Sequence, residues 1–356
     1  MKKIASSKPI VLEDLAAPFA RMGDDEAIQV AAFHYGLKGT VDRLVTEKDD
    51  TFRLQTENGR RFILKIANPV EPQSEIDLQV SLLEYIEKHD PSIPVPRVIP
   101  NKSGASHFIM EDAAGQKRSV RVMSYLEGRP LDALSSSPGQ REAIGSILAR
   151  LRLCMSNFDH PAAERILAWD VKNLAGLSHL AATVKDPHHR DLLELGLERF
   201  YQFEPQIHKL RTQVLHNDFS KSNIVVDPEA QNFVTGVIDF GDTVNTAIAI
   251  DVSTALLNQL PRNSGRLADE DIFSEPRDLL RGYLRIASLD DEELALIPHL
   301  VMSRVITRAL LSLRLAESFP ENSTYLLRNT LQGWAQLDWF LRRTPDEISS
   351  TLTTTV

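Results

Sequence analysis

The sequence predicts an α+β protein with two lobes, an antiparallel-sheet lobe at the front of the chain and a mostly helical lobe behind it. Up to about residue 128, short runs of β-branched and aromatic residues alternate with turn signals. Past residue 139, long stretches carry apolar residues at helical spacing. A chain of 356 residues is long enough for two such units, which we divide at 1–123 and 124–356.

The first predicted elements are strands. Residues 40–45, "TVDRLV", form one, and residues 51–67, "TFRLQTENGRRFILKIA", form two more around the Asn58-Gly59 dipeptide. Asn-Gly between two such runs is typical of a type I′ turn, which joins antiparallel neighbours. The front of the chain therefore begins with antiparallel strands.

One helix is predicted for the front lobe, over residues 74–89. Ser74 followed three residues later by Asp77 indicates a capping box at its start. Residues 91–100 contain four prolines and are predicted to be extended, because proline disfavours a helix at its own position and at the one before. Two further strands are expected over 106–112 and 119–128.

The rear lobe is predicted to be helical around one polar hairpin. Its amphipathic stretches cover residues 141–157, 189–203, 247–260, 277–287 and 294–318. Only "NIVVD" (223–227) and "NFVTGVIDF" (232–240) resemble strands, and we expect them to pair with each other. Because ligands favour the space between two lobes, we expect a site there.

Composition restricts the partners. A net charge of −9 argues against nucleic-acid phosphate as the main partner and is compatible with a cationic small molecule. The single cysteine, Cys154, excludes an internal disulfide and a cysteine-based zinc site, and its apolar surroundings predict a buried, unreactive thiol. The sequence shows neither a secretory leader nor an 18-residue apolar segment. We expect a cytoplasmic protein that spans no membrane.

The residues that suggest chemistry gather in "LHNDFSKSNIVVD", residues 215–227. His216, Asp218 and Asn223 share this loop, and Asp239 follows an apolar strand in "VIDFGD". Phosphoryl transfer needs such a set: a carboxylate that orients the attacking hydroxyl and accepts its proton, and oxygen ligands for Mg²⁺. The plain alternative is a polar turn that leads into a strand.

Lys65 stands late in the predicted strand "FILKIA". A charged side chain among apolar neighbours costs desolvation free energy unless it is paired, so this lysine is a candidate to hold nucleotide phosphates. The alternative is an exposed lysine on the solvent face of the strand. Its occurrence upstream of Asp218 and Asp239 favours the phosphate role.

These residues carry a resemblance to a known family. "HNDFSKSNIVVD" and "GVIDFGD" resemble the catalytic loop and metal-binding aspartate of the aminoglycoside-phosphotransferase-like kinases, small-molecule enzymes with a protein-kinase-like fold. The segment "FHYGLKGTVDRLVTEKDDTFRLQTENGRRFILKI" is most similar to hydroxylysine kinases, through its Tyr-Gly-Leu, Asp-x-x-Phe and Lys-Ile. Together with "VRVMSYLEGRPL", the resemblance spans roughly residues 30 to 330.

The resemblance implies a role for each matching residue of the catalytic set. Asp218 corresponds to the catalytic base, and Asn223 and Asp239 correspond to the Mg²⁺ ligands. Lys65 corresponds to the lysine that holds the phosphates of ATP or GTP, and His216 to a residue that orients the loop.

The resemblance also places the purine. Residues 123–126 correspond to the hinge, where backbone groups, including those of Ser124 and Leu126, meet the base. Further along, Asp251 corresponds to the aspartate that begins a helix in this family.

The chain departs from the family pattern in the front lobe. No glycine-rich loop covers the phosphates, because the first turn reads "TEKDDTF", so backbone amides or the Thr51 hydroxyl must substitute unless the loop is simply solvated. The helix partner of Lys65 is open as well. Glu75 in the first turn is our candidate, although Gln79 shares a face with the apolar residues and occupies a competing position.

Two residues near the catalytic set have open roles. Lys221 either neutralises the transferred phosphate or is a solvated loop lysine. Asp242 either meets an ammonium group of the substrate or caps the next helix.

The acceptor is expected to be a small molecule, because no long activation segment and no Ala-Pro-Glu element follow "IDFGD". A hydroxylated amino acid or amino alcohol is the leading class, with hydroxylysine first. Homoserine, choline and an aminoglycoside are alternatives, and a nucleotide-binding protein without activity is another.

Overall fold

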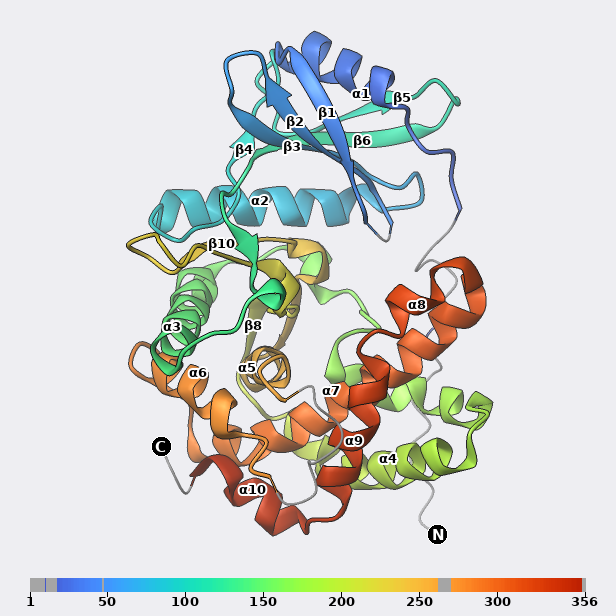
Figure 1. The fold of residues 1–356 in the computed structure, drawn as a ribbon, viewed down its shortest axis with the longest axis vertical. Coiled ribbons are helices and arrows are strands. Elements are labelled where there is room, and N and C mark those ends of the chain that lie inside the picture. The colour runs from blue at the N-terminus through green and yellow to red at the C-terminus, as the bar shows by residue number, and fades with distance from the viewer. Residues whose placement is uncertain (1–9, 11–17, 47, 262–269, 354–356) are drawn as a thin grey trace.

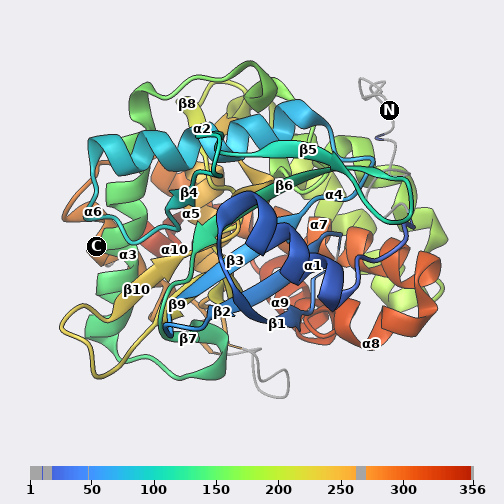
Figure 2. The ribbon, with the colours of Figure 1, turned by 90° about the horizontal axis from the view of Figure 1, so that it is seen from above.

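A computed structural model describes residue 10 and residues 18–46, 48–261 and 270–353 of the chain. A sheet lobe lies above a helical lobe, and α2 (Gln73–His89) crosses between them (Figure 1). The predicted α+β class and two-lobed architecture are confirmed. Figure 2, a view from above, shows α2 along one side of the sheet and α1 (Asp24–Val30) over its outer face.

The front lobe is built on one antiparallel sheet. Its strands are β1 (Gly39–Leu44), β2 (Asp50–Thr56), β3 (Arg61–Ile66), β4 (Val98–Ile99), β5 (Phe108–Glu111) and β6 (Lys117–Ser124), in the spatial order β1-β2-β3-β6-β4 with β5 also paired to β6. A short π-helix (Ala31–Tyr35) extends α1. Every strand predicted for this lobe is present.

Alternation along β3 separates a core face from a functional face. Phe62, Leu64 and Ile66 are buried and pack into the apolar cluster under α1. Because successive side chains of a strand point to opposite faces, Lys65 lies on the other face. Its cross-strand neighbours are Thr51 on β2 and Arg121 on β6, so one row of polar side chains faces away from the core.

The turn between β2 and β3 is not the predicted type I′ turn. That type requires positive φ at both central residues, and among the described residues only Asn217 and Asp239 have it apart from glycines. The Gly59 amide donates to the Thr56 carbonyl at 2.8 Å, and Gly59 has φ +81°. A longer loop that ends in a left-handed glycine therefore joins the strands.

The capping box predicted for α2 is wrong. The helix begins at Gln73 with Pro72 as its N-cap, and no side chain caps it. The extended backbone of Pro72 starts the helix one residue early, which leaves Ser74 inside the first turn. Asp77 instead accepts a hydrogen bond from His107 Nε2 at 2.8 Å.

The rear lobe contains the five predicted helices, which are α3 (Pro138–Cys154), α4 (Pro187–Ile207), α5 (Ile248–Leu257), α6 (Ser274–Leu284) and α7 (Asp291–Ser318). It also contains helices that were not predicted, α8 (Ser323–Leu326), α9 (Thr330–Leu341) and α10 (Pro345–Thr353), and a long 3-10 stretch, η6 (Val171–Thr183). The thiol of Cys154, at the end of α3, is partly buried, and burial raises its pKa, as expected of an unreactive cysteine.

The rear lobe has more strands than predicted. The expected hairpin, β9 (Ile224–Val226) with β10 (Val234–Val237), is present, and β7 (Arg129–Pro130) pairs with β9. A further pair, β8 (Thr212–Leu215) with β11 (Val244–Ala247), was not predicted. Both strands have only four residues, too few for alternation to stand out in the sequence.

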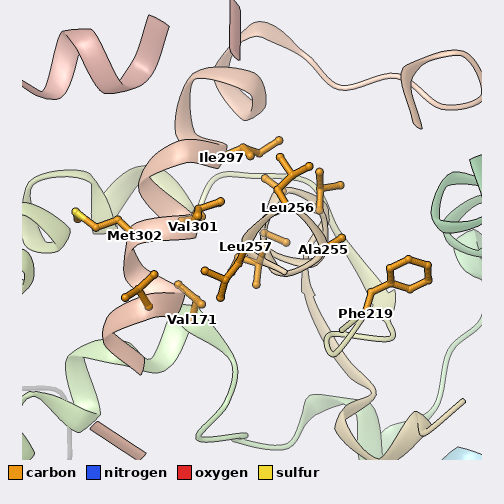
Figure 3. Close-up of a cluster of buried hydrophobic side chains, with 14 of the residues drawn as sticks. Val171, Phe219, Ala255, Leu256, Leu257, Ile297, Val301 and Met302 are labelled. Atoms are coloured by element: carbon orange, nitrogen blue, oxygen red, sulfur yellow. The ribbon is translucent and has the colours of Figure 1, made fainter. Parts of the chain in front are cut away.

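Helix α7 forms the centre of the rear lobe. Its Ile297, Val301 and Met302 pack with Leu256 and Leu257 of α5 in a buried cluster (Figure 3). Contrary to the prediction that the chain has no 18-residue apolar segment, α7 contains an 18-residue window with mean hydropathy 1.5 that is long and apolar enough to cross a membrane. Because 83% of that window is buried inside the protein, α7 has the character of a core helix.

Candidate active site

Two strand pairs in the rear lobe hold the loop that carries His216, Asp218 and Asn223. The loop leaves β8 at Leu215 and enters β9 at Ile224. Because β8 pairs with β11, Leu215 lies opposite Val244, two residues past Asp242. The Ile238 amide also donates to the Asn223 carbonyl at 2.9 Å. These pairings bring the loop and the segment after β10 together.

Asp251 of α5 fixes the beginning of the loop. Its carboxylate accepts a hydrogen bond from the Asn217 amide at 2.8 Å, and the side chain is buried. Asn217 has φ +61°, a left-handed conformation that asparagine tolerates better than most residues. Burial raises the pKa of Asp251 to about 6, although the Asn217 amide and Arg304 oppose the rise.

His216 serves the backbone of the loop with both ring nitrogens. Nε2 lies 3.0 Å from the Ile238 carbonyl oxygen, and Nδ1 accepts from the Asp218 amide at 3.2 Å. Burial lowers the pKa of the ring, which favours the neutral form. These bonds suit the loop-orienting role inferred from the sequence.

Asp218 and Asn223 are joined directly. The Asn223 amide nitrogen Nδ2 donates to Asp218 Oδ2 at 2.6 Å and to the Asp218 carbonyl oxygen at 3.1 Å. Since Nδ2 is engaged, the carbonyl oxygen Oδ1 of Asn223 is the atom left for a cation. The Asp218 side chain keeps 33% of its surface exposed, so a small molecule has access to the carboxylate.

The environment of Asp218 raises its pKa to about 7. Burial among protein atoms is the largest cause, and the negative charge of Asp242 adds to it. Arg304 and the hydrogen bond from Asn223 act in the opposite direction. A carboxylate with a pKa near neutrality suits proton transfer at physiological pH.

Asp239 lies at the end of β10 in an unusual conformation. Its φ of +62° is left-handed, and its Oδ1 accepts a hydrogen bond from the Gly241 amide at 3.4 Å. The side chain is 53% exposed and lies 3.8 Å from Lys65 Nζ. The ammonium group of Lys65 is the main reason that the pKa of Asp239 is lowered, so its carboxylate is ionised and available to a cation.

Lys65 is paired with Asp49, and the expected partner Glu75 lies elsewhere. Lys65 Nζ is 3.3 Å from Asp49 Oδ2, at the end of the first loop. Burial acts to raise the pKa of Asp49, but Lys65 and Arg121 outweigh it and the pKa is lowered. Glu75 instead forms an ion pair with Arg165 of the rear lobe. The Asp-x-x-Phe element of the sequence begins at Asp49, and it was the one pattern that could have indicated this pairing.

Gln79 of α2 contacts this charge cluster. Its Oε1 accepts from Arg121 Nη2 at 2.9 Å, and its Nε2 donates to Glu71 Oε1 at 3.3 Å. Burial and the neighbouring Asp49 raise the pKa of Glu71. Lys48 also belongs here: burial acts to lower its pKa, but Glu71 and Asp242 outweigh it and the pKa is raised. Lys48, Asp49 and Arg121 were not predicted from the sequence.

The first loop is not simply solvated where it meets β2. Asp49 and Thr51 are buried, and the Thr51 hydroxyl has no hydrogen-bond partner among the described residues. Buried hydroxyls are usually paired, so an unpaired one beside Lys65 is a candidate contact for a ligand.

The expected hinge is partly engaged in protein contacts. The Ser124 amide donates to the Arg97 carbonyl at 2.8 Å, and the Ser124 hydroxyl accepts from the Arg97 amide at 2.8 Å. Leu126 packs on Gly236 of β10, where an added Cβ would lie 2.7 Å from Leu126 Cδ1. In the described part of the chain no backbone hydrogen bond engages Leu126, so of the two hinge candidates it has the freer backbone.

Arg165 connects the two lobes beside the segment that follows Asp239. Besides Glu75 of α2, its guanidinium donates to the Gly241 carbonyl at 2.5 Å and to the Thr243 carbonyl at 3.0 Å. These two carbonyls lie just after Asp239, in the segment that leads to β11. The sequence held no motif that marks this arginine.

Lys221 and Asp242 lie next to the proposed metal ligands. Lys221 begins the short 3-10 turn that ends at Asn223. Asp242 ends a similar turn, and α5 begins only at Ile248 with Ala247 as its N-cap, so Asp242 does not cap that helix. The capping alternative for Asp242 is therefore wrong.

The oxygen atoms present suit a nucleotide-bound divalent cation. No group of three or more His, Cys, Asp or Glu side chains that could hold a metal occurs in the described part of the chain. Mg²⁺ that accompanies a nucleotide needs only one or two protein ligands, because phosphates and water supply the rest. Asn223 Oδ1 and the Asp239 carboxylate are the oxygen atoms that could meet that need.

Comparison with known proteins places this site in a family. Residues 46–289 match the phosphotransferase enzyme family. Hydroxylysine kinase from Mus musculus is 22% identical, and the alignment covers 94% of this chain and 90% of that protein. Among solved structures, amicoumacin kinase hAmiN in complex with AMP-PNP, Ca²⁺ and Ami has a TM-score of 0.67 at 20% identity, over 88% of this chain and 93% of that one. A microcompartment-associated aminopropanol kinase has a TM-score of 0.64 at 20% identity, over 88% and 96%. These likenesses confirm the kinase-like fold.

Proposed function

Since the chain belongs to the phosphotransferase enzyme family, we propose that it transfers the γ-phosphate of ATP or GTP to a hydroxyl of a hydroxylated amino acid or amino alcohol, with hydroxylysine the first substrate to test. The similarity to hydroxylysine kinases over nearly the whole chain supports that choice of acceptor. A cytoplasmic location, where both nucleotides are available, is part of the proposal.

One observation carries the proposal: Lys65 of the sheet lobe contacts the segment of the helical lobe that carries Asp218, Asn223 and Asp239. Lys65 Nζ lies 3.8 Å from Asp239, and Asn223 bonds Asp218 at 2.6 Å. The Ile238–Asn223 backbone hydrogen bond joins the two pairs. A cation, two carboxylates and an amide oxygen around one point form the set that phosphoryl transfer requires.

Each residue then has a distinct task. Lys65 holds the nucleotide phosphates, with Lys48 as a second cation and the Thr51 hydroxyl as a further donor. Asn223 and Asp239 bind Mg²⁺, which supplies charge neutralisation on the phosphates when bound. Backbone groups near Leu126 meet the purine.

The rear-lobe residues act on the acceptor. Asp218 orients the acceptor hydroxyl and takes its proton as the new oxygen–phosphorus bond forms and the bond to the nucleoside diphosphate breaks. Asp242 is close enough to affect the pKa of Asp218, and its carboxylate is proposed to meet an ammonium group of the acceptor. Lys221 is a lesser candidate to neutralise the transferred phosphate.

Nucleotide consumption measured against a panel of hydroxylated amines tests the proposal. The panel contains hydroxylysine, homoserine, choline, an aminopropanol and an aminoglycoside, each with ATP and with GTP. Acceptor-dependent formation of nucleoside diphosphate, abolished by Asp218→Asn, is expected with at least one amine. Calorimetric binding of Mg-nucleotide without turnover of any acceptor would instead favour a binding protein that has lost activity.

A further inference from the structure

A buried arginine lies beside the proposed base. Arg304, on α7, is only 5% exposed, and its Nη2 lies 3.9 Å from Asp218 Oδ1. Its Nη1 donates to the Trp169 carbonyl oxygen, and its guanidinium carbon lies 5.4 Å from the centre of the Trp169 ring. The residue was not recognised from the sequence, because it stands in the middle of an apolar helix.

The guanidinium of Arg304 has carboxylates near it but no hydrogen bond to one among the described residues. At 3.9 Å, its contact with Asp218 is an ion pair without a hydrogen bond. In the described part of the chain, no other carboxylate lies within 4 Å of this guanidinium. Burial of a charge is costly unless its hydrogen bonds are satisfied, and a guanidinium is shaped to bind a carboxylate through two parallel bonds. A ligand carboxylate would supply what the protein does not.

We propose that Arg304 binds the carboxylate of an amino-acid acceptor while Asp218 binds its hydroxyl, which makes the acceptor an amino acid and not an amino alcohol. This inference rests on the proposed function. Arg304 Nη2 and Asp218 Oδ1 lie 3.9 Å apart. If the ligand makes one hydrogen bond to each of them, its hydroxyl and carboxylate oxygens can lie up to about 9 Å apart. The γ-hydroxyl of homoserine and the δ-hydroxyl of hydroxylysine both fall within that limit.

The charges around Asp218 agree with a zwitterionic acceptor. Arg304 provides one positive group, and Asp242, the other main charge that affects Asp218, provides a negative group for the ammonium. An acceptor that carries amines and no carboxylate would face Arg304 with like charge and give its guanidinium no hydrogen-bonded carboxylate, a cost that lowers affinity for such compounds.

Matched pairs of acceptors test the inference. Each amino acid, hydroxylysine or homoserine, is compared with the amino alcohol that remains when its carboxylate is removed. The wild-type enzyme is expected to have the higher kcat/KM for the amino acid of each pair. Arg304→Met should reduce that preference by roughly 10–100-fold, the value of a charged hydrogen-bonded contact, and Arg304→Lys should reduce it less.

A matched control is Arg199→Met on α4, which also removes an arginine whose Nη1 donates to a carbonyl, that of Phe340 at 2.7 Å. This variant should keep the wild-type preference. Nucleotide binding by each Arg304 variant establishes that the protein is folded. If Arg304→Met does not fold, the inference is still tested by the ratio of kcat/KM for the amino acid to that for its decarboxylated partner, measured in the wild-type enzyme and in Arg304→Lys.

Equal losses on both members of a pair would overturn the inference, because they would mean that Arg304 serves only the charge of Asp218 or the transferred phosphate. A wild-type enzyme that prefers the decarboxylated compounds, or treats both alike, would also overturn it and leave the proposed function standing. If no hydroxylated amine is phosphorylated at all, it is the proposed function that fails.

Discussion

The two lobes contribute opposite charge to the site. The sheet lobe provides Lys48, Lys65 and Arg121, whose positive charges are only partly balanced by Asp49 and Glu71. The helical lobe provides Asp218, Asp239, Asp242 and Asp251, with Arg304 as the cation among them. The first set suits a polyanion such as a triphosphate, and the second suits a divalent cation and an acceptor hydroxyl. Each half is therefore expected to respond differently to substitution.

The largest effect is expected in the helical lobe. Asp218→Asn removes the proposed base but keeps the size of the side chain, and kcat should fall by about 10³-fold, within the range for general-base catalysis. Nucleotide affinity, measured by calorimetry, should change little, because the phosphates are held from the other lobe. Turnover that survives the substitution would remove Asp218 as the base.

In the sheet lobe, Lys65→Met should act mainly on the nucleotide. Loss of a charged contact with the phosphates should lower kcat/KM for nucleotide by roughly 10–100-fold. Asp49→Asn should resemble it, because Asp49 pairs with Lys65 at 3.3 Å. Glu75→Gln is the control, and it should leave kcat/KM for nucleotide close to the wild-type value. If Glu75→Gln lowers this kcat/KM as Lys65→Met does and Asp49→Asn does not, the pairing of Lys65 with Asp49 is not needed for activity.

Arg165 tests whether the two lobes are coupled. Arg165→Met removes the tie from Glu75 to the Gly241 and Thr243 carbonyls. Without these contacts the loop that carries Asp239 should shift. Because small shifts of active-site groups lower the rate strongly, we expect kcat to fall about tenfold and the Mg²⁺ concentration needed for half-maximal activity to rise. A Mg²⁺ titration of activity measures this. An unchanged Mg²⁺ dependence would restrict Arg165 to a role in stability.

The sequence predicted the parts of this site that form short local patterns. The helical spacing of α2 to α7 and the order of Asp218, Asn223 and Asp239 required no long-range information. The partner of Lys65 was mispredicted because α2 begins at Gln73 and turns Glu75 towards Arg165, a contact 90 residues away in the chain. Arg165 and Arg304 stand in no motif, and only the packing of distant segments brings them to the site.

The pH dependence should also differ between the lobes. In the helical lobe the pKa of Asp218 is raised to about 7, so the base becomes protonated as the pH falls through that value. The value of kcat/KM for the acceptor should then drop about tenfold for each further pH unit. In the sheet lobe the pKa of Asp49 is lowered, so nucleotide binding should vary less over the same range. If kcat/KM for the acceptor and the affinity for nucleotide fall together as the pH is lowered, Asp218 is not the group responsible.

The smallest effect is expected at Thr51, where stability and activity should move in opposite directions. Its buried hydroxyl has no partner among the described residues, and such a group costs about 1–3 kcal/mol. Thr51→Val keeps the shape and removes that cost, so the free energy of unfolding should rise by about 1 kcal/mol. If the hydroxyl donates to a phosphate, kcat/KM for nucleotide should fall several-fold in Thr51→Val and stay near wild type in Thr51→Ser. A gain in stability without loss of activity would mean that the sheet lobe holds the nucleotide through its charged groups alone.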